Sequence, residues 1–173
     1  MSYAPVLLFV YNRPEHVRQA ILSLQQNVLS KESELFIYSD APKDETSREA
    51  VNETRRFIRT INGFKQITII ERNENWGLAR NIIDGVTTQV NRYGKVIVLE
   101  DDLVVAPYFL QFMNDALEVY KDGSRTYTGM RLYPSSQPAG YLPHQMDRQL
   151  GMGDLEPCLE TFQPRRKSTF TRA

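Results

Sequence analysis

Hydrophobic positions in the first 121 residues follow two alternating patterns. Short continuous apolar runs, typical of strands buried on both faces of a parallel sheet, occur four times. Between them lie longer segments whose apolar residues are three and four positions apart, as in an amphipathic helix. The predicted strands cover residues 5–11, 35–38, 67–70 and 95–99, and the predicted helices begin near residues 13, 45, 76 and 107. Strands that alternate with helices predict right-handed crossovers and a three-layer α/β/α sandwich with a mostly parallel sheet.

The predicted helices carry start and stop signals. Pro14 and Pro107 stand where helices begin, and Gly63 and Gly94 stand where the second and third helices are expected to end. The second helix is therefore expected to run from about residue 45 to residue 62. The apolar positions expected to face the sheet are Val17, Ile21, Leu24 and Val28 in the first helix, and Leu78, Ile82, Val86 and Val90 in the third.

An acidic triplet, Glu100-Asp101-Asp102, directly follows the fourth predicted strand. Ligands of open α/β sheets bind beyond the carboxyl ends of the strands. Three adjacent carboxylates repel one another, and a divalent cation would relieve that repulsion. Mg²⁺ and Mn²⁺ often take one or two carboxylates together with substrate phosphates. In an extended chain Glu100 and Asp102 would point to one side and Asp101 to the other. The alternative is a solvated acidic turn.

Polar residues also end the first two predicted strands. The Asp40 carboxylate could accept hydrogen bonds from a nucleobase or a ribose, although an Asx-Pro turn is the better explanation of this residue taken by itself. Tyr11-Asn12-Arg13 follow the first strand, where Tyr11 could stack on a base and Arg13 could meet a phosphate. The alternative there is a helix cap with a surface arginine.

Gly77 opens the third predicted helix. A glycine permits close backbone approach at a helix N-terminus, which is a natural site for an anion. Arg80 and Asn81 lie one turn further on and could face the same ligand. Trp76, the single tryptophan of the chain, is expected to serve packing.

Composition and charge argue against several classes of partner and site. The chain has 21 basic and 21 acidic residues, which are interspersed and give no support to nucleic acid as a partner. Cys158 is the single cysteine, so an internal disulfide and a cysteine-based zinc site are excluded. The longest apolar run is too short to span a bilayer and lacks the basic leader of a signal peptide. The expected setting is a reducing cytoplasm, with peripheral association at the inner face of the membrane as an option.

Residues 122–173 differ from the rest of the chain. They contain no Val and no Ile, whereas residues 1–121 contain 22, and they hold five of the nine prolines. Because strands draw on β-branched apolar residues, this part cannot continue the same sheet. We therefore expect a ligand-binding domain over residues 1–121 and an irregular tail over residues 122–173.

Four motifs, in their order and spacing, resemble the N-terminal half of a GT-A-fold glycosyltransferase. The likeness is to bacterial family-2 sugar transferases related to the N-acetylglucosaminyltransferase I group. The motifs cover residues 8–14, 39–43, 75–79 and 99–103. The resemblance implies a nucleotide-sugar donor, a UDP-sugar above all, and Mn²⁺ or Mg²⁺ as the cofactor. It implies a glycan or a lipid-linked acceptor.

The resemblance also implies residue roles. Asp102 matches the last acid of the family's Asp-x-Asp-type motif and would bind the cation that bridges the donor diphosphate. Glu100 or Asp101 would lie near the donor ribose and sugar, and Asp40 would recognise the nucleobase. The expected nucleotide-sugar site comprises Tyr11, Asn12, Arg13, Asp40, Gly77, Arg80, Glu100 and Asp101, with Asp102 as the metal ligand.

The chain departs from the family after residue 121. Inverting members supply a carboxylate base and most of the acceptor pocket from their second half, so we expect a C-terminally truncated chain that is inactive alone. The family carries a Trp-rich segment there. Some codons for residues 150–166, read one base later, encode such a segment, and Met152 before Gly153 forces a tryptophan in that frame. A frameshift near residues 120–130 is the favoured explanation, and a natural, divergent tail is the alternative.

Two other functions compete with a glycosyltransferase. The first is a non-catalytic nucleotide-binding remnant or gene fragment, which predicts no sugar transfer to any acceptor. The second is a receiver-like signalling domain with an acidic Mg²⁺ pocket. Receivers carry paired acids after the first strand, and residues 10–12 contain none, which argues against that class.

Overall fold

The computed structural model describes residues 2–119 of the 173-residue chain. The chain divides into two compact units, residues 1–115 and 116–173. The elements are β1 (Val6–Val10), α1 (Pro14–Gln25), the 3-10 helix η1 (Ser30–Glu32), β2 (Glu34–Ser39), α2 (Glu45–Ile58), β3 (Gln66–Glu71), α3 (Gly77–Tyr93), β4 (Ile97–Glu100) and α4 (Phe109–Val119). The expected boundary at residue 121, the irregular tail and the frameshift lie outside the described residues and stay predictions.

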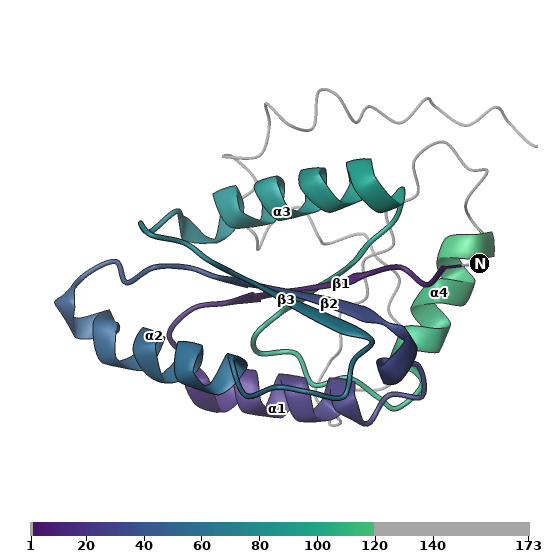
Figure 1. Cartoon of the computed structure of the whole chain (residues 1–173), viewed down its shortest axis with the longest axis horizontal. Coiled ribbons are helices and arrows are strands. Elements are labelled where there is room, and N and C mark those ends of the chain that lie inside the picture. Colours follow the sequence, from purple (N-terminus) through teal and green to yellow (C-terminus); the bar gives the residue numbers. More distant parts are fainter. Residues whose placement is uncertain (1, 120–173) are drawn as a thin grey trace, which may run out of the picture. The chain divides into compact units, whose positions relative to one another are not determined.

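The sheet has four strands in the order β3-β2-β1-β4, and every neighbouring pair is parallel. The register pairs Val10 with Ser39, Phe9 with Glu100 and Ser39 with Glu71, so the four carboxyl ends lie at one edge. Helices α1 and α2 cover one face of the sheet and α3 covers the other (Figure 1). The predicted α/β sandwich with a parallel sheet is confirmed.

The face toward α3 is built from aromatic and aliphatic residues of neighbouring strands. Phe9 of β1 and Tyr38 of β2 stack with ring centroids 5.0 Å apart. Leu7 and Phe36 complete the buried cluster. The residues packed against it are Ile70, Ile82, Val86, Tyr93 and Val96. Because strand side chains alternate between faces, the remaining apolar positions of β1 point toward α1 and α2, which explains the continuous apolar pattern.

Helix α3 approaches the sheet most closely at Gly85. A Cβ atom at this position would lie 2.9 Å from Phe9 Cζ and 3.0 Å from Tyr38 Cζ. The buried positions of α3 are accordingly Asn81, Gly85 and Gln89, spaced four residues apart. The predicted apolar stripe is therefore partly wrong, because Leu78 at its start remains exposed.

Replacing Gly85 by alanine is expected to destabilise the fold. Alanine favours a helix over glycine by about 1 kcal/mol, but crowding a close-packed contact costs roughly 1–3 kcal/mol. We expect a net loss of about 1 kcal/mol in the free energy of unfolding, measured by urea titration. Thr88→Ala, at an exposed position of the same helix, is the control and should not destabilise. A stabilised Gly85→Ala variant would contradict the close approach.

Two helices end earlier than predicted. Helix α1 ends at Gln25, so Val28 lies beyond it and is exposed. The Val28 N–H donates to Pro107 O at 3.0 Å, which turns the chain toward the start of α4. Helix α2 ends at Ile58 rather than at residue 62, and Gly63 lies in the following turn with a φ of 88°. None of the helices within residues 2–119 has the length and apolar character needed to cross a membrane.

Candidate functional site

The four segments singled out at the strand ends are connected to one another at the carboxyl edge of the sheet. Arg13 Nη1, after β1, lies 3.2 Å from Asp102 Oδ2, after β4. Tyr11 Oη, also after β1, accepts a hydrogen bond of 3.0 Å from the N–H of Lys43, after β2. Asp40 in turn contacts residues 75–77, after β3. Parallel topology thus brings together residues up to 89 positions apart in sequence.

The segment after β1 enters helix α1 directly. Arg13 is the N-cap residue of α1 and Pro14 occupies its first turn, as the sequence predicts. The Arg13 side chain is 51% exposed, while Tyr11 and Asn12 are half-buried. The hydrogen bond from Lys43 holds the Tyr11 phenol against the loop after β2. An exposed cation and a fixed aromatic ring therefore stand side by side at this strand end.

The acidic triplet forms a turn rather than an extended segment. Strand β4 ends at Glu100, and the N–H of Leu103 donates to Glu100 O at 3.4 Å. Asp101 and Asp102 therefore do not point to opposite sides. Both approach Arg13 Nη1, with Asp101 Oδ1 at 3.8 Å and Asp102 Oδ2 at 3.2 Å. The Asp101 side chain is only 8% exposed, whereas that of Asp102 is 44% exposed.

The Arg13 guanidinium only partly balances the negative charge of the acidic triplet. Burial raises the pKa of Glu100, and repulsion from Asp102 and Asp101 raises it further, against a smaller opposing effect of Arg13. Burial also raises the pKa of Asp101, and the Arg13 guanidinium offsets part of that increase. A cation near Asp102 would relieve this repulsion. The charge pattern therefore suits a cation.

Residues 2–119 do not form a complete metal site by themselves. Within residues 2–119 there is no group of three or more His, Cys, Asp or Glu side chains placed to bind an ion. Mg²⁺ and Mn²⁺ frequently take only one or two protein carboxylates and complete their shells with substrate phosphates and water. The exposed Asp102 carboxylate fits such a partial site.

The Asp40 carboxylate is buried and engaged by four protein donors. Its Oδ1 accepts from the N–H groups of Ala41 and Trp76, both at 2.9 Å. Its Oδ2 accepts from the Gly77 N–H at 2.8 Å and from Asn75 Nδ2 at 3.1 Å. A carboxylate offers about four acceptor positions, so this set fills them. Because α3 begins at Gly77, Asp40 also places a negative charge at the N-terminus of that helix.

The Asp40 carboxylate lies where the sequence predicts an anion at Gly77. Gly77 has a φ of 73°, and its N–H points to the Asp40 carboxylate, so the anion at this helix end belongs to the protein. Arg80 lies against the Trp76 ring, 3.9 Å from its centroid, with 61% of its side chain exposed. Asn81 instead is buried and bonds to Gly77 O and to Arg72 Nε. Arg80 and Asn81 thus face different partners.

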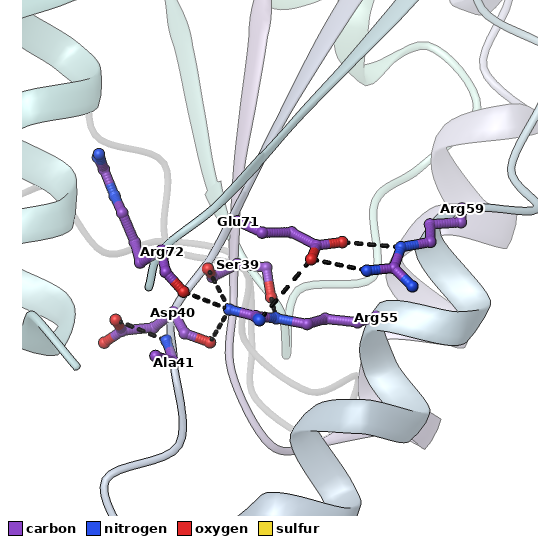
Figure 2. Close-up of polar contacts among 7 residues, drawn as sticks. All are labelled: Ser39, Asp40, Ala41, Arg55, Arg59, Glu71 and Arg72. Carbon is purple, nitrogen blue, oxygen red and sulfur yellow. Dashed lines mark hydrogen bonds and ion pairs between the residues drawn. The ribbon is translucent and has the colours of Figure 1, made fainter. Parts of the chain in front are cut away.

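Three residues that the sequence analysis does not assign to the site contribute contacts at this edge. Asn75 bridges Asp40 Oδ2 and Ala41 O. Arg72 lies over the Trp76 ring, 3.8 Å from its centroid, and forms an ion pair with Asp84. Arg55 of α2 donates to backbone carbonyls at the ends of β2 and β3 (Figure 2).

Arg55 could have been found from the helical periodicity. It shares a face with Val51, Thr54 and Ile58, the buried positions of α2. A charged residue within such a stripe indicates a specific polar partner. Arg72 offers no comparable signal, because it lies at the border of a polar loop. Asn75 begins the motif at residues 75–79, which could have marked it as a candidate.

Comparisons with known proteins identify the family of this chain. The sequence model of "Glycosyl transferase family 2" matches residues 6–169. No curated protein sequence matches the chain. Among solved structures, the crystal structure of S. aureus TarS matches with a TM-score of 0.47 and 15% identity, over 79% of this chain and 24% of that chain. The chain thus spans about a quarter of the length of TarS. Because the family match covers most of the chain, the protein belongs to glycosyl transferase family 2, as the resemblance to GT-A enzymes implies.

Proposed function

We propose that this chain binds a nucleotide-sugar donor, a UDP-sugar, together with Mn²⁺ or Mg²⁺ at the carboxyl edge of its sheet. The observation that carries the proposal is the meeting of Arg13 with Asp101 and Asp102 beside Tyr11 and Asp40. One edge then offers an aromatic ring, an exposed cation and an exposed acid, Asp102. These are the groups that a base, a diphosphate and a divalent cation require.

The nucleoside would lie at the ends of β1 and β2. The Tyr11 ring, held by the Lys43 N–H, is the stacking surface, and Asn12 lies beside it. A base N–H reaches the Asp40 carboxylate by replacing the Asn75 amide, whose hydrogen bond is the longest of the four at 3.1 Å. Gly77 serves this site indirectly, by holding Asp40. Arg80 is proposed to contact the nucleotide from the start of α3.

The diphosphate would lie between Arg13 and Asp102. Arg13 is the exposed cation at this position and can exchange its ion pair with Asp102 for one with a phosphate. Asp102 is the metal ligand, with Glu100 and Asp101 near the ribose and the sugar. A bound divalent cation would neutralise the charge that develops on the departing diphosphate.

Transfer of the sugar to a glycan or lipid-linked acceptor is the proposed reaction, at the inner face of the membrane. We propose that residues 2–119 supply donor binding and that transfer needs an acceptor-side base from outside them. The competing function is nucleotide binding without transfer. A chain that binds UDP but neither hydrolyses nor transfers any UDP-sugar would favour it.

Isothermal titration of the full chain with UDP, in Mn²⁺ or in EDTA, tests the proposal. A cation beside one carboxylate and a diphosphate contributes at least about 1.4 kcal/mol at a surface site, so EDTA should weaken binding at least about 10-fold. UMP, which lacks the second phosphate, should show little dependence on Mn²⁺. Absence of UDP binding, or equal binding of ADP and UDP, would contradict the assignment.

A further inference from the structure

We infer that Arg55 is a positioning residue for the nucleotide site. Its guanidinium fixes the carboxyl ends of β2 and β3 and thereby sets the position of Asp40 relative to the loop at residues 73–77. The inference rests on the proposed function, since it concerns the affinity of that same site for a nucleotide.

The Arg55 guanidinium lies where β2 and β3 separate (Figure 2). Its Nη2 donates to Ser39 O at 3.4 Å, to Asp40 O at 3.2 Å and to Arg72 O at 2.7 Å. Its Nε donates to Ser39 Oγ at 3.2 Å. The side chain is only 17% exposed. One cation therefore holds three carbonyl groups from two strands.

These carbonyls lie at the limit of the backbone ladder. The N–H of Arg72, one residue beyond the end of β3, donates at 2.9 Å to the carbonyl oxygen of Ser39, the last residue of β2. Asp40 O and Arg72 O, each one residue beyond its strand, accept hydrogen bonds from the Arg55 guanidinium. Arg55 thus continues the pairing of β2 and β3 by one step. The planar fork of arginine suits several acceptors at once, which the compact ammonium of lysine does not.

The carbonyl groups that Arg55 binds belong to both partners of the contact between Asp40 and the loop at residues 73–77. Asp40 is held through its own backbone carbonyl, while its carboxylate holds the Trp76 and Gly77 N–H groups. Arg72 O is the point from which the loop to residue 77 departs. Without the guanidinium, Asp40 and the loop each lose an anchor. The Asp40 carboxylate and the loop at residues 73–77 would then no longer keep a fixed separation, although the Asp40 N–H would still donate to Val10 O at 3.1 Å.

Arg59 provides a matched control on the same helix. Glu71 contacts both arginines, with its Oε2 3.7 Å from Arg55 Nη1 and 2.7 Å from Arg59 Nη2. Arg59 Nε also donates to Glu71 Oε1 at 2.9 Å. The Arg59 side chain is 58% exposed, and within residues 2–119 it donates to none of the three strand-end carbonyls. The two arginines share a carboxylate and differ in their hold on the strand ends.

The affinity test uses UDP with Mn²⁺ and the full chain. Arg55→Gln should weaken binding at least about 10-fold, Arg55→Lys should restore part of the loss, and Arg59→Gln should stay within about 2-fold of the parent chain. Circular dichroism at the titration temperature verifies that each variant is folded. Equal affinity of Arg55→Gln and the parent chain, or an equal loss in Arg59→Gln, would overturn the inference.

A second measurement needs no nucleotide. Hydrogen exchange by NMR reports on the Trp76 and Gly77 amides, which donate to Asp40. Arg55→Gln should speed their exchange at least about 10-fold, and Arg59→Gln should not. If affinity falls while these amides stay protected, Arg55 acts otherwise than by positioning, and the inference fails. If the parent chain binds no UDP, the proposed function fails first, whatever the exchange rates show.

Discussion

Replacing Asp102 by asparagine is expected to abolish the Mn²⁺-dependent part of UDP binding without unfolding the protein. The side chain is 44% exposed, and its described partner is Arg13 at 3.2 Å. Exposed ion pairs of this kind contribute about 0–1 kcal/mol to stability. Asparagine keeps the size of the side chain but removes the charge that a divalent cation requires. The affinity in Mn²⁺ should fall at least about 10-fold, to the value measured in EDTA.

The control for this prediction removes one negative charge at a different position. Glu15→Gln removes one negative charge from the first turn of α1, two residues from Arg13, where the side chain is 72% exposed. It should preserve the Mn²⁺ dependence, because Glu15 lies outside the acidic triplet. Titration calorimetry measures the affinity, and urea unfolding should give a similar midpoint for Asp102→Asn and the parent chain. If Asp102→Asn keeps the full response of the parent chain to Mn²⁺, Asp102 is excluded as the metal ligand.

Continuous apolar runs made the sheet predictable from sequence. Each of the four runs is a strand, because a strand covered by helices on both faces can hold few polar residues. Parallel topology then places all strand ends at one edge, so Tyr11, Asp40 and Asp102 could be grouped without coordinates. This reasoning needs only the order of elements and no contact distance.

The finer geometry was less accessible. The sequence does not show whether strand β4 includes Asp101, and the turn at residues 100–103 brings Asp101 and Asp102 to the same arginine. Leu78 fits a helical stripe by spacing, yet the path of α3 is set by the close approach at Gly85. Such details depend on which residue of a pattern makes the closest contact with the rest of the fold. A one-dimensional pattern does not contain that information.

The same limit applies to the partners of charged residues. The position of Asp40 at the end of β2 marked it as a candidate. Two of its four donors are backbone N–H groups that lie 36 and 37 residues away in the sequence. Backbone donors leave no mark in a sequence. Arg55 differs, because its position among Val51, Thr54 and Ile58 marks it as an inward-facing cation.

Asp40→Ala should be the most destabilising of the variants considered. The substitution leaves the Trp76 and Gly77 N–H groups without their acceptor at the start of α3, and Asn75 loses one of two partners. Loss of a cap costs about 1 kcal/mol, and a buried donor left without a partner costs roughly 1–3 kcal/mol. We expect a loss of about 3 kcal/mol in the free energy of unfolding, measured by urea titration, together with loss of UDP binding.

Trp76 gives this prediction a local readout, because it is the only tryptophan of the chain and its backbone N–H donates to Asp40 Oδ1 at 2.9 Å. Its fluorescence should shift toward the red in folded Asp40→Ala, since the loop is released to water. Asp40→Asn retains one carbonyl acceptor and should lose about half as much stability. Asp44→Ala removes the exposed cap of α2, where Asp44 Oδ1 accepts from the Ser47 N–H, and should cost less and leave the fluorescence unchanged. If Asp40→Ala were no less stable than Asp44→Ala, the four hydrogen bonds could not be what holds the loop, and Asp40 would be free to serve the nucleotide alone.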